Sequence, residues 1–293
     1  MKKKILNLGS INIDHTYTVN HFARPGETIA SNKYDISAGG KGFNQSIALA
    51  RAGAVACHAG HIGTNAEWLL KYLKHENVDI TNVEVVQTPT GHAVIQVIPS
   101  GENSIVLFGG ANQTISKSDV SRFLKYTSPG DYLLLQNETS SVDEAIHKGK
   151  KHKLRVIFNP APLTPAVYNY SLQDVNIFIL NETEAEGLTG KILAEDIREF
   201  MCKHFPRSAT VLTRGQQGAV YFNSKILLEQ SAIAVDAIDC TAAGDTFIGY
   251  FLAELIKSDN PAKALSVGCH AAAICVTREG SSDSIPFRKE LQN

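Results

Sequence analysis

The stretch Asp239-Cys240-Thr241-Ala242-Ala243-Gly244-Asp245 leads directly into an apolar segment, residues 247–256, of this 293-residue chain. Small residues ahead of an apolar-periodic run predict a loop that opens a helix, with Gly244 and Asp245 in the first turn. The backbone N–H groups of a first helical turn have no partner within the helix, and the helix dipole adds positive potential there. The turn is therefore suited to holding a phosphate group.

Asp245 needs an explanation in such a turn, because a carboxylate repels a phosphate group unless it takes part in the chemistry. A base that accepts the proton of an attacking hydroxyl meets this requirement. The alternative is an ordinary first-turn acid that the helix dipole favours. We therefore treat Asp245 as a candidate base and Ala242, Ala243 and Gly244 as a candidate anion hole.

A second glycine-rich segment lies near the N-terminus, Gly39-Gly40-Lys41-Gly42-Phe43-Asn44-Gln45-Ser46. Glycines let a ligand approach the backbone closely, and Lys41 and Asn44 supply polar groups beside them. The segment lacks the spacing of a P-loop, and no G-x-G-x-x-G follows the first predicted strand. Taken alone, it could be a flexible loop.

Composition narrows the class of protein. The chain is 43% hydrophobic and 19% charged, and its 28 Lys and Arg balance 29 Asp and Glu, so nothing favours nucleic acid as a partner. No run approaches the ~18 apolar residues of a membrane span. The five cysteines show no C-x-x-C spacing, so we expect a cytoplasmic chain with reduced thiols. The ten histidines form no H-x-x-x-H pair, which argues against zinc.

Short apolar runs alternate with helical patterns along most of the chain. Predicted strands are 5–8, 55–59, 132–135, 156–158, 177–180 and 210–213, and predicted helices are 44–51, 67–76, 118–126, 142–152, 194–204 and 244–256. This alternation predicts an α/β fold with a doubly wound, mainly parallel sheet flanked by helices. Ligands of such sheets bind beyond the carboxyl ends of the strands. Four polar residues lie at that end: Asp14, Asn159, Asn181 and Thr213.

Two segments interrupt this alternation, 15–38 and 91–108. Each contains two runs of alternating polarity joined by turn residues, which predicts two strands per segment and a small separate β-sheet. The remainder, 1–14, 39–90 and 109–293, is expected to form the α/β domain. Extra hairpins on the edge of the main sheet are the alternative.

The two glycine-containing segments, in this order, resemble those of the ribokinase-like family of sugar kinases. Further segments similar to that family occur in matching order, at 9–15, 24–28, 159–162, 181–186, 213–218 and 276–280. The resemblance implies ATP-dependent phosphorylation of the 5-hydroxyl of D-ribose, with the small sheet as a lid over the sugar. It also implies ATP, Mg²⁺ and K⁺ as cofactors.

The resemblance further implies roles for individual residues. For the sugar these are Asn12, Asp14, Gly40, Lys41, Asn44, Glu138 and Asp245. For the nucleotide they are Asn181, Thr213, Arg214, Gly215, Gln216, Gln217, Gly218, Gly244 and Cys269. Glu184 would hold magnesium through water, and potassium would be held by Asp239, Thr241, Cys275, Arg278, Gly280 and Ser284.

Simpler interpretations remain open for most of these residues. Asn12 and Asp14 could form a turn, Glu138 could be a solvated loop acid, and 213–218 could be a plain hairpin turn. The spacing of Asn181 and Glu184 fits a helix capping box, which is compatible with a magnesium role. Asp239 could cap a loop held by hydrogen bonds alone.

Three residues depart from the family pattern: Phe43, Cys240 and Cys269. Cys240 faces no evident chemistry, Cys269 stands where relatives line the adenine pocket, and Phe43 leaves the choice of sugar open. Phe43 could narrow the sugar pocket or pack beneath it. A kinase for deoxyribose, another pentose or a nucleoside is the nearest alternative, and a non-catalytic sugar-binding regulator is a more distant one. We also expect a homodimer in which two lids pack together through Ile95, Val97, Ile105 and Leu107.

Overall fold

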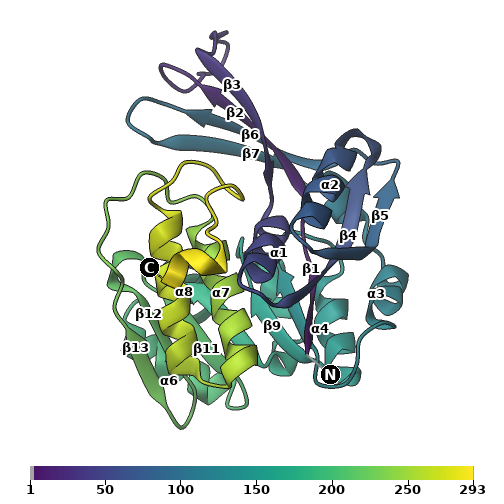
Figure 1. The fold of residues 1–293 in the computed structure, drawn as a ribbon, viewed down its shortest axis with the longest axis vertical. Helices are drawn as coiled ribbons and strands as arrows, with labels where there is room; N and C mark the ends of the chain where they lie inside the picture. Colours follow the sequence, from purple (N-terminus) through teal and green to yellow (C-terminus); the bar gives the residue numbers. More distant parts are fainter. Residues whose placement is uncertain (1–2, 293) are drawn as a thin grey trace.

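The main sheet explains most of the architecture. The structure, a computed structural model that describes residues 3–292, contains a nine-stranded sheet in the order β13-β12-β11-β10-β9-β8-β1-β4-β5 (Figure 1). Neighbouring strands pair in parallel from β11 to β5, and β12 and β13 add an antiparallel edge. The strands are β1 (Lys4–Leu8), β4 (Val55–Gly63), β5 (Asp79–Val86), β8 (Tyr132–Gln136), β9 (Arg155–Asn159), β10 (Ile177–Asn181), β11 (Ala209–Thr213), β12 (Ala219–Phe222) and β13 (Leu227–Gln230).

Helices cover both faces of this sheet. They are α1 (Lys41–Arg51), α2 (Glu67–His75), α3 (Lys117–Leu124), α4 (Val142–Lys151), α5 (Glu182–Thr189), α6 (Ala194–His204), α7 (Ala243–Ser258) and α8 (Pro261–Cys275). Successive residues of a strand point to opposite faces, so Ile5 joins one hydrophobic cluster with α1, α2, α7 and α8, and Leu6 joins a second with α3 to α6. The predicted doubly wound α/β fold is confirmed.

Four further strands form a separate small sheet that stands away from the main body (Figure 1). Its order is β3-β2-β6-β7, with a parallel β2–β6 pair between two antiparallel pairs. The strands are β2 (Asn12–Thr18), β3 (Lys33–Gly39), β6 (Gly91–Val97) and β7 (Asn103–Phe108). The alternative of extra hairpins on the main sheet is therefore wrong.

Short 3-10 turns connect several elements. They are η1 (Thr64–Ala66), η2 (Gly110–Thr114), η3 (Pro165–Asn169), η4 (Leu172–Asp174), η5 (Gly215–Gln217) and η6 (Arg288–Gln292). Among residues 3–292, none of the helices combines the length and hydrophobicity needed to cross a bilayer.

Candidate functional site

The site is organised around the start of α7. Ala242, the residue before the helix, adopts a left-handed conformation with φ 59° and ψ 5°, a region that residues with a side chain rarely enter. A Cβ placed on Gly244 would meet no atom within 4 Å, so the space beside the first turn is open. The loop thus turns sharply into a helix whose N-terminus faces an unobstructed space, as the sequence predicted for an anion-binding turn.

That space is a cavity of about 230 Å³ at the carboxyl ends of β9, β10 and β11. The residues that line it include Lys41, Asn181, Glu184, Thr213, Gly244 and Asp245. These residues come from four different parts of the chain. The fold therefore brings together groups assigned by sequence to the sugar, the nucleotide and the metal ion.

Asp245 is buried, with 8% of its surface exposed, and both carboxylate oxygens accept hydrogen bonds from α1. Asn44 Nδ2 donates to Oδ2 at 3.2 Å, and Gln45 Nε2 donates to Oδ1 at 2.8 Å. Burial raises the pKa of Asp245, while Lys41 and the two amides oppose that rise. Asp245 in turn raises the pKa of Lys41. The carboxyl is thus a stronger base than a solvated one, yet is held beside a cation.

A chain of buried amides fixes the orientation of Gln45. Asn7 Nδ2 donates to the Gly42 carbonyl at 2.7 Å, so the Asn7 oxygen faces Gln136. Gln136 Nε2 donates both to Asn7 Oδ1 at 2.9 Å and to Gln45 Oε1 at 2.6 Å. The Gly42 carbonyl can only accept a hydrogen bond, so Asn7 must direct its NH₂ group toward it. This fixes which end of Gln136, and then of Gln45, is the donor. Gln45 must then present its NH₂ group to the carboxylate.

The predicted sugar residues surround the start of α1. Glu138 accepts hydrogen bonds from the Ser10 hydroxyl and from the Lys41 backbone N–H, the latter at 2.9 Å. Burial, together with Glu138, raises the pKa of Asp14 to about 6. Asn12 is buried, and its Oδ1 accepts from Asn112 Nδ2 at 2.7 Å. Glu138 is therefore a half-buried, hydrogen-bonded group and not a solvated loop acid.

Glycines are required where α1 begins. Gly40 has φ 91°, and a Cβ on Gly42 would collide with the backbone of Gly9 and Ser10. This close approach brings the glycine loop against the turn that follows β1. Phe43 is fully buried and packs edge-on against Tyr72, with ring centroids 5.6 Å apart. Phe43 thus belongs to the hydrophobic core beneath the loop and does not line the cavity.

Asn181 and Glu184 form a capping box at the start of α5. Asn181 Oδ1 accepts from the Glu184 N–H at 2.7 Å, and Glu184 Oε2 accepts from the Asn181 N–H at 3.1 Å. Asn159 Nδ2 also donates to Glu184 Oε2, at 3.2 Å. Burial raises the pKa of Glu184. A carboxylate that lines the cavity beside amide oxygens is a donor set suited to a hydrated magnesium ion.

The predicted nucleotide segment, residues 213–218, joins β11 to β12 as an antiparallel turn. Thr213 reaches the cavity, whereas the turn from Gly215 to Gln217 is exposed and Arg214 pairs with Glu229 at 3.4 Å. Cys269 is buried in the hydrophobic cluster of α8 and does not line this cavity. Cys240, in contrast, is exposed and does line it.

The predicted cation loop is gathered behind the start of α7. Asp239 accepts from the Thr241 N–H at 2.8 Å and from the Gly280 N–H at 3.0 Å. The Cys275 thiol lies 3.1 Å from the Ser284 hydroxyl. Arg278 directs its side chain away, to Glu290. Residues 239–241 and 275–284 thus lie together. The hydrogen bonds that Asp239 accepts are those expected if it simply caps the loop.

Sequence reasoning missed several side chains of the site: Asn7, Ser10, Gln45, Asn112 and Gln136. Gln136 ends a buried strand, the same signal that singled out Asn159 and Asn181, and the rule could have been applied to it. Gln45 stands within the glycine-loop segment but lacks a distinguishing pattern. The others are polar residues that only their partners identify.

Comparison with known proteins adds independent findings. A family model described as pfkB family carbohydrate kinase matches residues 2–288. A ribokinase from Haemophilus influenzae is 38% identical, over 99% of this chain and 97% of its own length. Two solved structures are similar in fold over nearly the whole of both chains. A ribokinase from Thermotoga maritima has a TM-score of 0.88 at 31% identity, covering 99% of this chain and 98% of that one. A ribokinase from Arabidopsis thaliana, complexed with ribose and ATP, has a TM-score of 0.87 at 28% identity, covering 100% and 98%.

Proposed function

The chain belongs to the pfkB family of carbohydrate kinases, and we propose that it transfers the γ-phosphoryl group of ATP to the 5-hydroxyl of D-ribose. The observation that carries the proposal is the cavity in which Lys41 and Glu184 lie beside Asp245 and Gly244 of the first turn of α7. Such a cavity suits phosphoryl transfer, which needs positioning and charge stabilisation more than covalent chemistry. The likeness to ribokinases supports ribose as the sugar.

Asp245 acts as the general base in this proposal. Burial raises the pKa of its carboxyl and Lys41 opposes that rise, so a carboxyl of raised basicity is held beside a cation, where it can accept the proton of the sugar hydroxyl. Asn44 and Gln45 hold the carboxylate in one orientation. The buried Oδ1 of Asn44 has no hydrogen-bond partner among the described residues and is available to a sugar hydroxyl.

The first turn of α7, Ala242 to Gly244, stabilises the charge that develops on the transferred group. Its N–H groups and the helix dipole point into the cavity without needing to reorganise during the reaction. Lys41 adds a full positive charge. Asn12, Asp14, Gly40 and Glu138 bind the sugar hydroxyls, and the small sheet covers them as a lid.

Magnesium would be held through water by Glu184, with Asn181 beside it, and when bound it would neutralise phosphate charge. The capping box of α5 sets the orientation of Glu184, so the two roles coexist. ATP would extend along residues 213–218, with Cys269 near the base. The buried position of Cys269 means that any contact there is apolar.

Potassium would be held by Asp239, Ser284 and backbone carbonyls of Thr241, Cys275, Arg278 and Gly280. Oxygen ligands of this kind suit a large, weakly hydrated ion. The loop lies directly behind Ala242. An ion that orders the loop would therefore also fix the first turn of α7, the proposed anion hole, and so raise turnover. Turnover should then be higher in potassium than in sodium, and Asp239→Ala should lose that response. Equal rates in potassium, sodium and a bulky organic cation would show that hydrogen bonds alone hold the loop.

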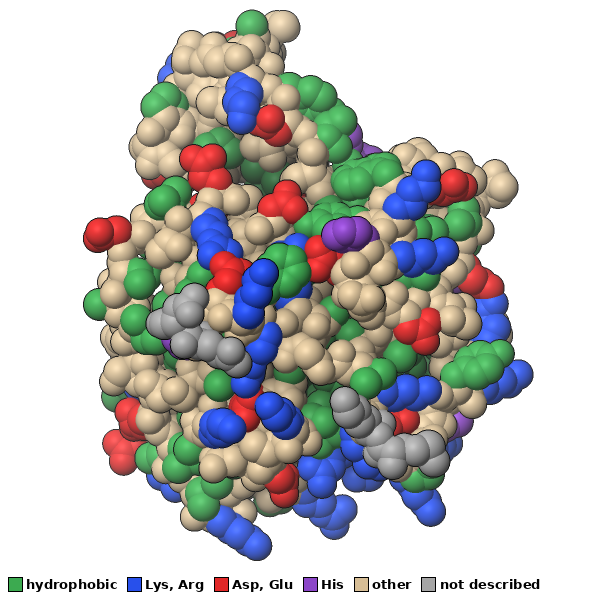
Figure 2. Space-filling view, in the orientation of Figure 1, with side chains coloured by type: hydrophobic (Ala, Val, Ile, Leu, Met, Phe, Trp, Pro, Cys, Tyr) green, Lys and Arg blue, Asp and Glu red, His purple; other side chains and the backbone are tan. Residues whose placement is uncertain are grey.

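A homodimer through the small sheet completes the proposal. Ile95 lies opposite Ile105 in the β6–β7 ladder, and alternation along each strand places Val97 and Leu107 on the same face. Hydrophobic side chains are visible on this sheet in Figure 2, and a second copy would cover them. The five free cysteines support a cytoplasmic location.

The test is an assay of ADP release over a panel of D-ribose, deoxyribose, fructose, adenosine and uridine. We expect the highest kcat/KM with D-ribose. A higher kcat/KM with deoxyribose or a nucleoside would contradict ribose as the substrate but would still show kinase activity. Binding of ribose without ADP release from any member of the panel would instead support a sugar-binding regulator.

A further inference from the structure

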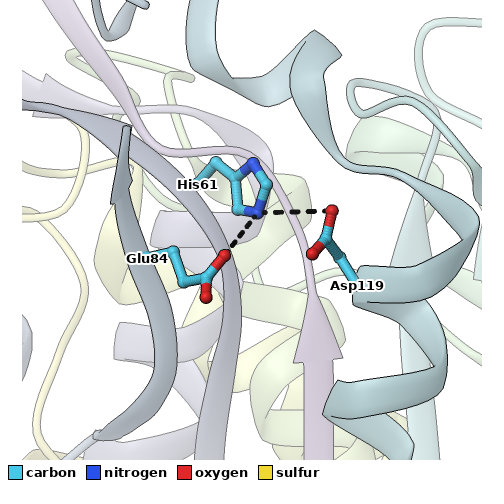
Figure 3. A group of neighbouring side chains, drawn as sticks. All are labelled: His61, Glu84 and Asp119. Carbon is cyan, nitrogen blue, oxygen red and sulfur yellow. Dashed lines mark ion pairs between the residues drawn. The ribbon is translucent and has the colours of Figure 1, made fainter. Parts of the chain in front are cut away.

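Three side chains from separate elements converge on the sheet face opposite α7. They are His61 on β4, Glu84 on the edge strand β5 and Asp119 on α3 (Figure 3). His61 Nε2 lies 3.3 Å from Glu84 Oε2 and 3.8 Å from Asp119 Oδ2. The ring is only 4% exposed, and Nε2 has no hydrogen-bond partner among the described residues. A buried, unpartnered ring nitrogen thus points between two carboxylates.

The neighbours of His61 settle which ring nitrogen carries the proton. The Thr114 hydroxyl donates its single hydrogen to the Ala111 carbonyl at 2.7 Å. Thr114 Oγ1 lies 2.8 Å from His61 Nδ1, and it can only accept there. Nδ1 therefore carries the proton, and in the neutral ring Nε2 presents a lone pair to both carboxylates. A ring-nitrogen lone pair that faces two negatively charged carboxylates is repelled by them unless a cation lies between.

Arg122 does not supply that cation, because it occupies the far oxygen of each acid. Its guanidinium contacts Glu84 Oε1 and donates to Asp119 Oδ1 at 2.8 Å. The inner oxygens, Oε2 and Oδ2, are left toward His61. Asp119 Oδ2 also accepts from the Ser116 N–H at 2.8 Å and from its hydroxyl at 2.6 Å. One guanidinium against two carboxylates leaves one negative charge uncompensated within this group.

We propose that His61, Glu84 and Asp119 bind a divalent transition-metal ion, with Zn²⁺ the best match. One imidazole and two carboxylates give three protein ligands and leave a position for water. With zinc bonds of about 2.0–2.1 Å, tetrahedral ligand atoms lie ~3.4 Å apart, close to the 3.3 Å and 3.8 Å separations in the structure. Thr114 and Arg122 act as the outer groups that orient the ligands.

A second proton on the ring is the competing cation, and Nε2 is the position that it would occupy, because Nδ1 already carries a proton. A bound metal ion would join β4, the edge strand β5 and α3. It would also brace, through Thr114, the turn η2 that carries Asn112. The absence of an H-x-x-x-H pair could not reveal this site, because its ligands come from three distant segments.

The experiment measures binding of Zn²⁺, and of Co²⁺ as a spectroscopic probe, to metal-stripped full-length protein without nucleotide. We expect one ion whose affinity falls at least ~100-fold in His61→Gln and in Glu84→Gln. The matched control is His147→Gln, because His147 is 45% exposed and pairs with a single carboxylate, Asp174, at 3.5 Å. That variant should bind as the wild type does.

A stability measurement keeps the proposal falsifiable if a variant folds poorly. A hundredfold excess of Zn²⁺ over Kd should raise the Tm of the wild type by roughly 5 °C, and that of Glu84→Gln far less. Unchanged binding in Glu84→Gln, or no bound ion in the wild type, would overturn the proposal. So would an NMR spectrum in which both nitrogens of His61 are protonated at pH 7.5.

Discussion

The two sides of the proposed sugar site differ in how completely they are built. Asp245 is almost fully buried, and both of its carboxylate oxygens already accept hydrogen bonds. The small sheet on the other side leaves Ile105 55% exposed and Val106 68% exposed. The Asp245 side is preorganised by hydrogen bonds without a ligand, whereas the small sheet exposes apolar side chains to solvent.

This difference indicates a division of labour. Preorganised donors around a base stabilise a transition state without reorganisation at the moment of reaction. A lid, in contrast, must admit and release a sugar, so it is drawn from a part of the fold with few buried contacts. We therefore expect substitutions near Asp245 to act on turnover and substitutions in the small sheet to act on sugar affinity and assembly.

The largest effect is expected at the base. Asp245→Asn keeps the shape of the side chain but removes the proton acceptor, so kcat should fall by roughly 100-fold or more with ATP binding retained. Steady-state kinetics and nucleotide titration measure the two quantities. Asp259→Asn, at the opposite end of α7, is the matched control. Near-wild-type turnover of Asp245→Asn would remove the base role.

The amide chain should give the next effect. Gln136→Met leaves Gln45 without the donor that fixes its orientation, so kcat should fall ~10-fold with little change in the KM for ATP. The hydrogen bond from Gln45 lowers the pKa of Asp245, so its loss should move the acidic limb of the kcat profile to higher pH. Gln173→Met changes an exposed glutamine and serves as the control. An unshifted pH profile would indicate that Gln136 has only a packing role.

Substitutions in the small sheet should change dimerisation and the KM for ribose and not kcat. Ile105→Lys places a charge on the face proposed to pack against a second copy, so the dimer should dissociate and the KM for ribose should rise several-fold. Light scattering at micromolar concentration and sugar kinetics test both points. Val85→Lys, at a half-exposed apolar site on β5, controls for added charge. A wild type that is monomeric and fully active would contradict the dimer.

The smallest effect concerns pH. Asp14 has a pKa of about 6, raised by burial and by Glu138. Its ionised form accepts sugar hydroxyls, so the KM for ribose should rise as the pH falls through 6 and stay level above 7. Asp14→Asn should have a higher KM that no longer changes over this range.

Stability should move in the opposite direction from affinity. The pKa of Asp14 is higher in the folded than in the unfolded chain, so this carboxyl destabilises the fold above pH 6. That penalty is relieved as the pH falls from 6 toward 4. Protonation of Asp14 near pH 5.5 should therefore weaken sugar binding without destabilising the folded chain, which thermal melts can check. Melts that show Asp14 stabilising the fold more at pH 7 than at pH 5 would contradict this sign.

Local signals explain the elements that were predicted well. The loop and apolar run at residues 239–256 predicted a helix over 244–256, and α7 spans Ala243–Ser258. The glycine loop predicted a helix from residue 44, whereas α1 begins at Lys41 because Gly42 also takes helical geometry. β5 was missed, since its exposed and half-buried positions give an edge strand no continuous apolar run.

By itself, the sequence determined the α/β fold, the small sheet, the turn that opens α7 and three polar residues at the strand ends, Asn159, Asn181 and Thr213, because each leaves a pattern within one short segment. The prediction was wrong for Asp14, which lies within β2 of the small sheet. Only the tertiary structure decided which groups these residues meet. Gln45 reaches Asp245 across 200 positions, Ser10 reaches Glu138 across 128, and His61 meets Asp119 from another layer. Hydrogen-bond direction, burial and the resulting pKa shifts depend on such neighbours, and no local pattern encodes them.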